Sequence, residues 1–149
     1  MTVNSMTRPI DMVGSVIDIV DPNHDVLGES IIWDKDKGLL WWVDGIGMFI
    51  YCLDPSTGQK QSWQLHEEIG SIGFRKKGGL VVGMRSGLYF FNPENGQLSE
   101  IAKPDSDRPG NRFNDGKVDR HGRFWTGTVQ ASAYTPRGRL WRLDADLKT

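Results

Sequence analysis

The stretch NRFNDGKVDRHGRFWTGT, from Asn111 to Thr128, brings together side chains that bind anions, hydroxyl groups or a metal ion. Arg112, Asn114, Asp115 and Lys117 all fall within it. A guanidinium, an amide, a carboxylate and an ammonium group at such short spacing could form the floor of an active site. This is the first candidate site of the chain.

The same stretch is also typical of reverse turns. Asp115-Gly116 and His121-Gly122 are turn-forming pairs, and Asp-Gly is a strong short-range signal for a β-hairpin. Phe124-Trp125-Thr126 after them favours a β-strand. The local pattern therefore leaves two interpretations open, ordinary turn architecture or a functional site.

A second candidate is Glu29, which stands between Gly28 and Ser30 just before an apolar strand-forming run. From the residues alone, Glu29 is expected to be a solvated carboxylate at the end of a strand. Ser30 has no matching histidine, so a serine nucleophile has no support. The three histidines are far apart in the sequence and are expected at the surface rather than as metal ligands: His24, His66 and His121.

Composition excludes several classes of partner. Eighteen Lys and Arg against nineteen Asp and Glu give a net charge of −1, which predicts no nucleic-acid partner and no anionic membrane surface. The N-terminal residues contain no apolar run long enough for a signal peptide or a membrane span. The single cysteine, Cys52, cannot form a disulfide within the chain and is expected to be a buried, inert thiol. A cytoplasmic protein is therefore expected.

The elements that must position these candidates follow a repeat of roughly 42 residues, which occurs three times. Each copy has an apolar residue, a polar turn containing glycine, and a strand of β-branched or aromatic residues; the turn glycines are Gly38, Gly79 and Gly122. A second strand follows in each copy and ends in an Asp or Asn turn. In two copies, Asp54 and Asn92, this turn has Pro next and Gly three residues later, which predicts reverse turns.

A period near 40 with about four short strands per unit is the signature of β-propeller blades, so we predict an all-β fold. The six tryptophans are expected to pack within the blades. Residues 15–21 read as one further strand ahead of the first unit. Three blades are fewer than a closed propeller needs, and they leave open faces and edges that invite association.

Two stretches, LGESIIWDKDKGLLWWVD and NRFNDGKVDRHGRFWTGT, resemble the SMP-30/gluconolactonase family, which includes regucalcin-like lactonases. The resemblance extends from about Ser15 to the end of the chain. It implies a six-bladed propeller with a divalent cation in the central channel and hydrolysis of sugar lactones. It therefore implies that residues 15–149 form the N-terminal half of such a propeller, with residues 1–14 disordered or poorly ordered.

The resemblance also assigns roles to residues of this chain. Glu29 matches a metal ligand, Arg112 and Asn114 match substrate-binding residues, and Asp115 matches an aspartate close to the site. The cation would be calcium or zinc, with magnesium and manganese as alternatives. Two further ligands, an asparagine and the aspartate that is the general base, belong to later blades, so no catalytic residue is expected before Thr149.

Two classes of function follow. The first is a truncated, metal-dependent sugar-lactone hydrolase that is inactive as an isolated monomer. The alternative is a non-catalytic β-propeller scaffold or interaction module that binds through its open blade edges. A third arrangement joins the two: a homodimer about a twofold axis would complete the ring and bring two Glu29 carboxylates to that axis.

Overall fold

The computed structural model describes residues 19–22, 24–130 and 136–145. Within these ranges the regular secondary structure consists of β-strands, as the repeat predicts, and includes no helix long and apolar enough to cross a membrane. The predicted strand at 15–21 lies mostly outside the described residues, and Ile19, Val20 and Asp21 are not in a strand. The predicted disorder of residues 1–14 lies wholly outside them.

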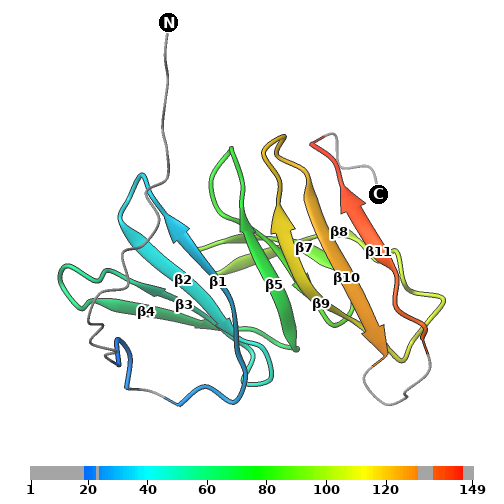
Figure 1. Cartoon of the computed structure of the whole chain (residues 1–149), viewed down its shortest axis with the longest axis horizontal. Helices are drawn as coiled ribbons and strands as arrows, with labels where there is room; N and C mark the ends of the chain where they lie inside the picture. Colours follow the sequence, from blue (N-terminus) through cyan, green and yellow to red (C-terminus); the bar gives the residue numbers. More distant parts are fainter. Residues whose placement is uncertain (1–18, 23, 131–135, 146–149) are drawn as a thin grey trace, which may run out of the picture.

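The strands form three antiparallel sheets, each a meander in chain order (Figure 1). We call them blades 1 to 3. Blade 1 contains β1 (Gly28–Asp34), β2 (Leu39–Asp44), β3 (Phe49–Leu53) and β4 (Lys60–Gln64). Blade 2 contains β5 (Ile69–Phe74), β6 (Leu80–Met84), β7 (Leu88–Asn92) and β8 (Gln97–Ala102). Blade 3 contains β9 (Asn111–Val118), β10 (Phe124–Gln130) and β11 (Leu140–Leu143). The all-β prediction and the propeller blades are confirmed.

The first strand of each blade is the inner strand, and β5 lies between β1 and β9 (Figure 1). Two glycines of β5 allow β9 to approach closely. A Cβ atom on Gly70 would lie 2.4 Å from the carbonyl oxygen of Phe113, and one on Gly73 would lie 2.6 Å from a methyl carbon of Val118. Any larger side chain at these positions would push the inner strands of blades 2 and 3 apart.

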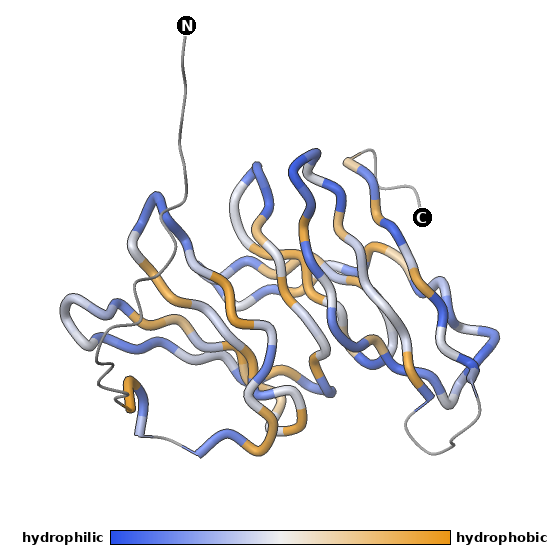
Figure 2. The backbone as a smooth tube through the Cα atoms, in the orientation of Figure 1, coloured by the Kyte–Doolittle hydropathy of each residue, from blue (hydrophilic) through white to orange (hydrophobic). Residues whose placement is uncertain are grey.

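Apolar side chains hold neighbouring blades together, and Figure 2 shows that hydrophobic residues recur along the strands of the backbone. The larger cluster joins blades 1 and 2 and includes Trp41, Val43, Ile50, Ile72, Leu80, Val82 and Phe91. The smaller cluster joins blades 2 and 3 and includes Val81, Leu88, Phe113, Phe124 and Leu143. Each contact between neighbouring blades is therefore stabilised by the burial of apolar surface from both blades.

The turns predicted at the three repeat glycines and after Asp54 occur with the expected chemistry. Gly38, Gly79 and Gly122 all adopt positive φ, at 69°, 71° and 77°, a conformation that only glycine adopts at little cost. At the second turn of blade 1, the Asp54 carboxylate accepts hydrogen bonds from the amide and the hydroxyl group of Ser56. Short-range sequence signals were therefore sufficient to predict these turns.

The predicted hairpin turn at Asp115-Gly116 is wrong, because both residues lie inside β9. Gly116 does not adopt positive φ; it is needed because a Cβ atom there would lie 2.7 Å from Ser71 Oγ of blade 2. The turn comes later, where the Asp119 carboxylate accepts the amide hydrogens of His121 and Arg123. Close packing between blades, rather than turn geometry, accounts for this glycine.

Candidate functional site

The inner strand β1 carries Glu29 at an irregular point of its pairing with β2. Ser30 has a positive φ of 54°, unusual for a residue with a side chain, and the register shifts between Glu29 and Ile32. The Ser30 hydroxyl accepts a hydrogen bond of 2.9 Å from the Ile72 amide of β5. This hydrogen bond connects the irregular segment around Glu29 to blade 2. The Ser30 hydroxyl therefore has a structural role, and no catalytic role is needed to account for it.

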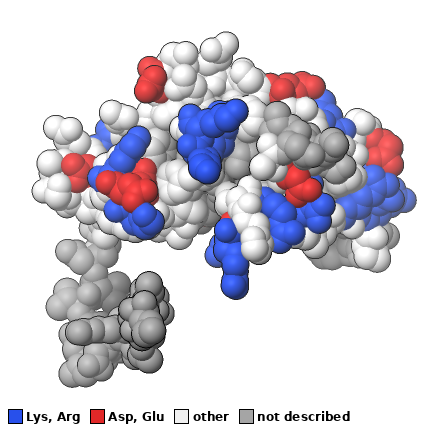
Figure 3. Space-filling model, turned by 90° about the horizontal axis from the view of Figure 1, so that it is seen from above, with Lys and Arg blue, Asp and Glu red and all other residues white. Residues whose placement is uncertain are grey.

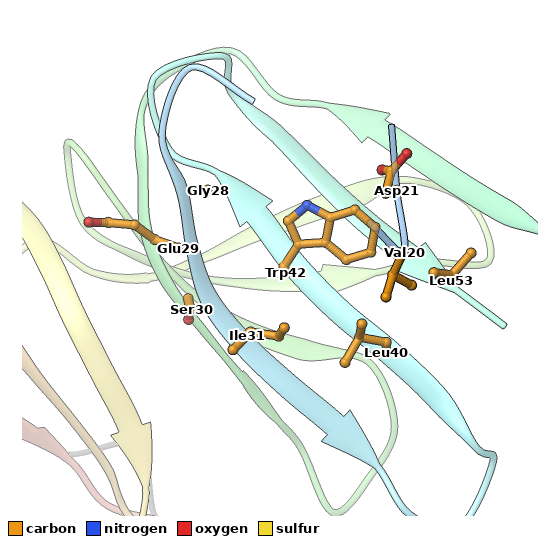
Figure 4. A pocket seen from close by; sticks show the side chains of 9 residues that line it. All are labelled: Val20, Asp21, Gly28, Glu29, Ser30, Ile31, Leu40, Trp42 and Leu53. Carbon is orange, nitrogen blue, oxygen red and sulfur yellow. The ribbon is translucent and has the colours of Figure 1, made fainter. Parts of the chain in front are cut away.

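The Glu29 side chain points away from Trp42, to the other side of β1 (Figure 4). It is half-buried, and within the described residues no hydrogen bond or ion pair reaches its carboxylate. A partly desolvated carboxylate without a partner is free to bind a cation. The structure therefore leaves Glu29 available for the role that the family resemblance implies.

Arg112 and Asn114 lie together on β9, as their spacing predicts for residues on one face of a strand. Arg112 Nη1 donates hydrogen bonds to Asn114 Oδ1, at 3.3 Å, and to the carbonyl oxygen of Phe113, at 3.2 Å. Its Nε lies 3.5 Å from Glu68 Oε2, and its side chain is only 19% exposed. The guanidinium group is therefore held in one orientation by groups of two blades.

Sequence reasoning missed Glu68, which immediately precedes β5. Its carboxylate contacts Arg112 on one side and accepts a hydrogen bond of 3.1 Å from Arg85 on the other. The chain of charges from Arg85 through Glu68 to Arg112 crosses the boundary between blades 2 and 3. Nothing in the sequence near Glu68 signals this contact, because its partners are 17 and 44 residues away.

Asp115 is exposed, and its carboxylate accepts a hydrogen bond from the amide of the next residue, Gly116, at 2.8 Å. Its carbonyl oxygen accepts another from the Thr126 hydroxyl, at 3.1 Å. Both contacts support the local conformation of β9. A direct role for Asp115 in binding substrate stays a prediction.

Glu29 and Arg112 border different hollows. Glu29 lies at the edge of a groove of about 360 Å³ on blade 1, whose other walls are mostly apolar (Figure 4). Arg112 borders a polar crevice of about 230 Å³ together with Arg85 and Arg108. These two hollows share no lining residue, so the structure does not bring Glu29 and Arg112 together in one pocket.

A complete metal site is not formed by the described residues. They contain no group of three His, Cys, Asp or Glu side chains arranged to hold a metal ion. Calcium takes six to eight oxygen ligands, and catalytic zinc takes about three protein ligands. Glu29 fits as one oxygen ligand, and the remaining ligands would have to come from other residues.

Asp44, another residue that sequence reasoning missed, anchors the segment that leads into β1. Its buried carboxylate accepts the backbone amides of Val26, Leu27 and Gly47 at 2.8 to 3.0 Å. Burial acts to raise the pKa of Asp44, but these hydrogen bonds outweigh it, and the pKa lies below its ordinary value of 3.8. Asp44 therefore holds the chain just before Glu29 in place.

The remaining reactive side chains behave as the sequence predicts. Cys52 is buried, and burial raises the pKa of its thiol to about 11, so it is protonated and inert at neutral pH. The three histidines are exposed. Trp33 is an exception among the tryptophans, since 52% of it is exposed although packing was expected.

These features define a β-propeller arc that carries polar site residues on its inner strands. The sequence profile described as the SMP-30/Gluconolactonase/LRE-like region matches residues 27–149, and the chain belongs to this family. It is 40% identical over 122 residues to 6-deoxy-6-sulfogluconolactonase from Pseudomonas putida, covering 81% of this chain and 42% of the relative. It is 43% identical over 103 residues to regucalcin from Xenopus laevis, covering 69% and 34%.

A solved structure shows the same arrangement of blades. The calcium-binding protein regucalcin from Agrobacterium tumefaciens superposes with a TM-score of 0.78 at 26% identity, over 84% of this chain and 42% of that protein. The chain thus spans about two fifths of the length of such relatives. The family and the propeller fold are established by these matches.

Proposed function

We propose that this chain supplies one side of the active site of a metal-dependent sugar-lactone hydrolase of the gluconolactonase type. The observation that carries the proposal is the placement of an unpaired carboxylate, Glu29, and an oriented pair, Arg112 and Asn114, on inner strands of one arc. Lactonases among the relatives support the choice of reaction and of a sugar lactone as substrate.

In this proposal each residue has a separate task. Arg112 and Asn114 orient the hydroxyl groups of the sugar, and the Arg112 guanidinium offsets negative charge that develops on the lactone carbonyl oxygen. Glu68 keeps that guanidinium in position. Glu29 would be one ligand of a divalent cation, calcium or zinc with magnesium or manganese as alternatives. When bound, such a cation supplies polarisation of the ester carbonyl and acidification of a bound water.

As an isolated monomer the chain should have little or no lactonase activity, because neither a full ligand set nor a general base is found among its described residues. We propose that three further blades complete the site, and that a second copy of this chain is one source of them.

A non-catalytic interaction module is the alternative function. The exposed apolar side chains on blade 1 favour it, because they form a surface that could bind a partner.

Paramagnetic Mn²⁺ tests the metal assignment even if binding is weak, because it broadens the NMR signals of nearby amides. We expect Mn²⁺ to broaden the amide signals around Gly28 to Ser30 in the wild-type chain. Glu29→Gln should abolish this broadening, and the control Glu94→Gln, in an exposed turn, should leave it unchanged. Broadening that persists in Glu29→Gln would remove Glu29 from the metal site.

A further inference from the structure

The polar crevice of about 230 Å³ between blades 2 and 3 lies directly beside Arg112. Every residue that lines it belongs to blade 2, to blade 3 or to the loop that joins them. Arg112 lies near the start of β9, the inner strand of blade 3, whereas Thr128 lies on β10, the second strand. The crevice therefore leads from the inner strands outward between two packed blades.

Positive charge predominates in the lining of this crevice. Its charged residues are three arginines, Arg85, Arg108 and Arg112, and one aspartate, Asp105. The Asp105 carboxylate is turned to other partners, because Oδ2 accepts a hydrogen bond of 2.6 Å from Asn111 and Oδ1 accepts one of 3.1 Å from Arg139. The three guanidinium groups therefore determine the sign of the charge that a ligand would meet.

Two of the three arginines share a single carboxylate. Glu68 Oε1 accepts a hydrogen bond of 3.1 Å from Arg85 Nη1, and Glu68 Oε2 lies 3.5 Å from Arg112 Nε. The neighbouring Glu67 accepts hydrogen bonds from the amide and the hydroxyl group of Ser86, and Glu67 does not line the crevice. Two guanidinium groups on one carboxylate leave a positive charge that an anion would compensate.

The third arginine, Arg108, is fixed in place without being neutralised at close range. Its Nη1 donates a hydrogen bond of 2.9 Å to the carbonyl oxygen of Arg137, and its Nε lies 3.8 Å from Asp107 Oδ2. The Asp107 carboxylate already accepts two hydrogen bonds of 2.9 Å from Arg139. The Arg108 guanidinium is therefore held at one edge and is able to bind a further acceptor.

Hydrogen-bond donors remain available at the crevice. Within the part of the chain that the structure describes, no hydrogen bond uses the Nη2 group of Arg85, Arg108 or Arg112. The hydroxyl group of Ser106, another lining residue, likewise has no partner there. Guanidinium and hydroxyl donors are the groups that bind the oxygens of phosphate, sulfonate and carboxylate groups. The crevice therefore matches a small oxyanion.

We infer that this crevice binds an acidic group of the substrate, a phosphate, sulfonate or carboxylate, so that the substrate class is acidic sugar lactones. The inference rests on the proposed function, in which Arg112 and Asn114 contact the sugar ring. Since Arg112 borders the crevice, a sugar bound there has its far end toward Arg85 and Arg108. An acidic group at that end neutralises the excess positive charge, which a neutral sugar leaves uncompensated.

Positive charge alone does not define the site. Basic side chains also occur on the side of the molecule where the hairpin turns that follow the inner strands lie, which Figure 3 views from above. Arg120 is in such a turn, at the other end of β9 from Arg112, and it is exposed. Because Arg120 does not line the crevice, it provides a matched control of the same charge in the same blade.

A titration followed by the amide NMR signals of the full chain tests the inference without any need for turnover. The ligands are glucose 6-phosphate and glucose, which have the same ring and differ only in the acidic group. We expect glucose 6-phosphate to bind about tenfold more tightly and to shift the signals of Ser86, Ser106 and Thr128. Glucuronate, with a carboxylate at the same carbon, should also bind more tightly than glucose. Added salt should reduce both differences.

Variants of the lining arginines assign the effect to the crevice. Arg108→Gln should lower the affinity for glucose 6-phosphate about fivefold or more, and its spectrum with glucose should stay as in the wild-type chain. Arg85→Gln should have an effect in the same direction, and it serves as a second variant if Arg108→Gln disturbs its loop. Arg120→Gln removes the same charge and should leave the affinity unchanged.

The outcomes that would overturn the inference are distinct. Equal affinity for glucose 6-phosphate, glucuronate and glucose would overturn it, and so would a preference for the acids that survives both variants. Glucose 6-phosphate that binds no more tightly than inorganic phosphate would show an anion site without a sugar. Failure of the proposed function gives another result, in which neither sugar shifts the Asn114 signal. Failure of the inference alone leaves that shift in place and removes only the added affinity from the acidic group.

Discussion

Blade 2 and blade 1 are built from the same sequence repeat, but they differ in how much of it is buried. All five residues of β6 in blade 2 are buried, because blades 1 and 3 cover its two faces. In blade 1, Trp41 and Val43 of β2 are buried against blade 2, while Ile31 of β1 stays exposed on the opposite face. The repeat specifies a two-sided sheet, and the neighbours decide which side is closed.

The comparison of the two blades shows that residue type alone does not determine whether a side chain is buried. Ile31 and Ile72 are the same amino acid at the same position of the repeat, and they lie at opposite extremes of exposure. A side chain contributes to stability only when a partner removes it from water. The exposed side chain of Ile31 therefore contributes little to the stability of the described blades.

The largest expected effect comes from the same substitution at these two positions. Ile72→Ala leaves a cavity between blades 1 and 2 and should lower the free energy of unfolding by about 2 to 5 kcal/mol. Ile31→Ala removes an exposed side chain and should change it by less than about 0.5 kcal/mol. Urea unfolding of both variants, at dilutions where the chain is monomeric, measures the contrast. Equal losses would mean that blade 1 already has a cover.

A smaller effect is expected from adding a methyl group to glycines on the two faces of blade 3. Gly116→Ala would place Cβ 2.7 Å from Ser71 Oγ and 2.8 Å from the carbonyl oxygen of Trp125, and should cost about 1 to 3 kcal/mol through overpacking. Gly127 faces the open side, and its nearest neighbour would be 3.9 Å away. Gly127→Ala is therefore the matched control and should be nearly neutral in thermal unfolding.

The smallest effect concerns the anchor of blade 1 and depends on pH. The folded pKa of Asp44 is below its unfolded value, so its contribution to stability is present above about pH 4 and is lost as the pH falls through the folded pKa. Asp44→Asn should lower stability at pH 7 by about 1 kcal/mol. It should also flatten the fall in stability between pH 4 and pH 2. An unchanged slope in that window would assign the acid sensitivity to other carboxylates.

Much of the fold could be predicted because its signals are local. The turn glycines, the Asx turns and the alternation of apolar residues act within a few residues of one another, and they fixed the blade repeat. Asp115-Gly116 failed as a turn because tight contact with blade 2 requires the same amino acid that a turn requires. A short motif cannot distinguish these two reasons for a glycine.

The candidate site likewise contains some contacts that the sequence predicts and others that it does not. Arg112 and Asn114 are close in sequence on one strand, and their hydrogen bond follows from strand geometry. Glu68 joins them only because blades 2 and 3 pack together, and no pattern near it predicts the contact. The pinning of Glu29 through the Ser30 hydroxyl likewise depends on an amide of another blade.

The sequence by itself determined the strands, the turns and the family of this protein, because these depend on interactions between residues close along the chain and on motifs that are contiguous. The tertiary structure alone decided which faces are closed, which glycines serve packing, and which partners hold Arg112 and Glu29. Those features depend on surfaces that meet across blades, and their separation in the sequence hides them until the blades are packed.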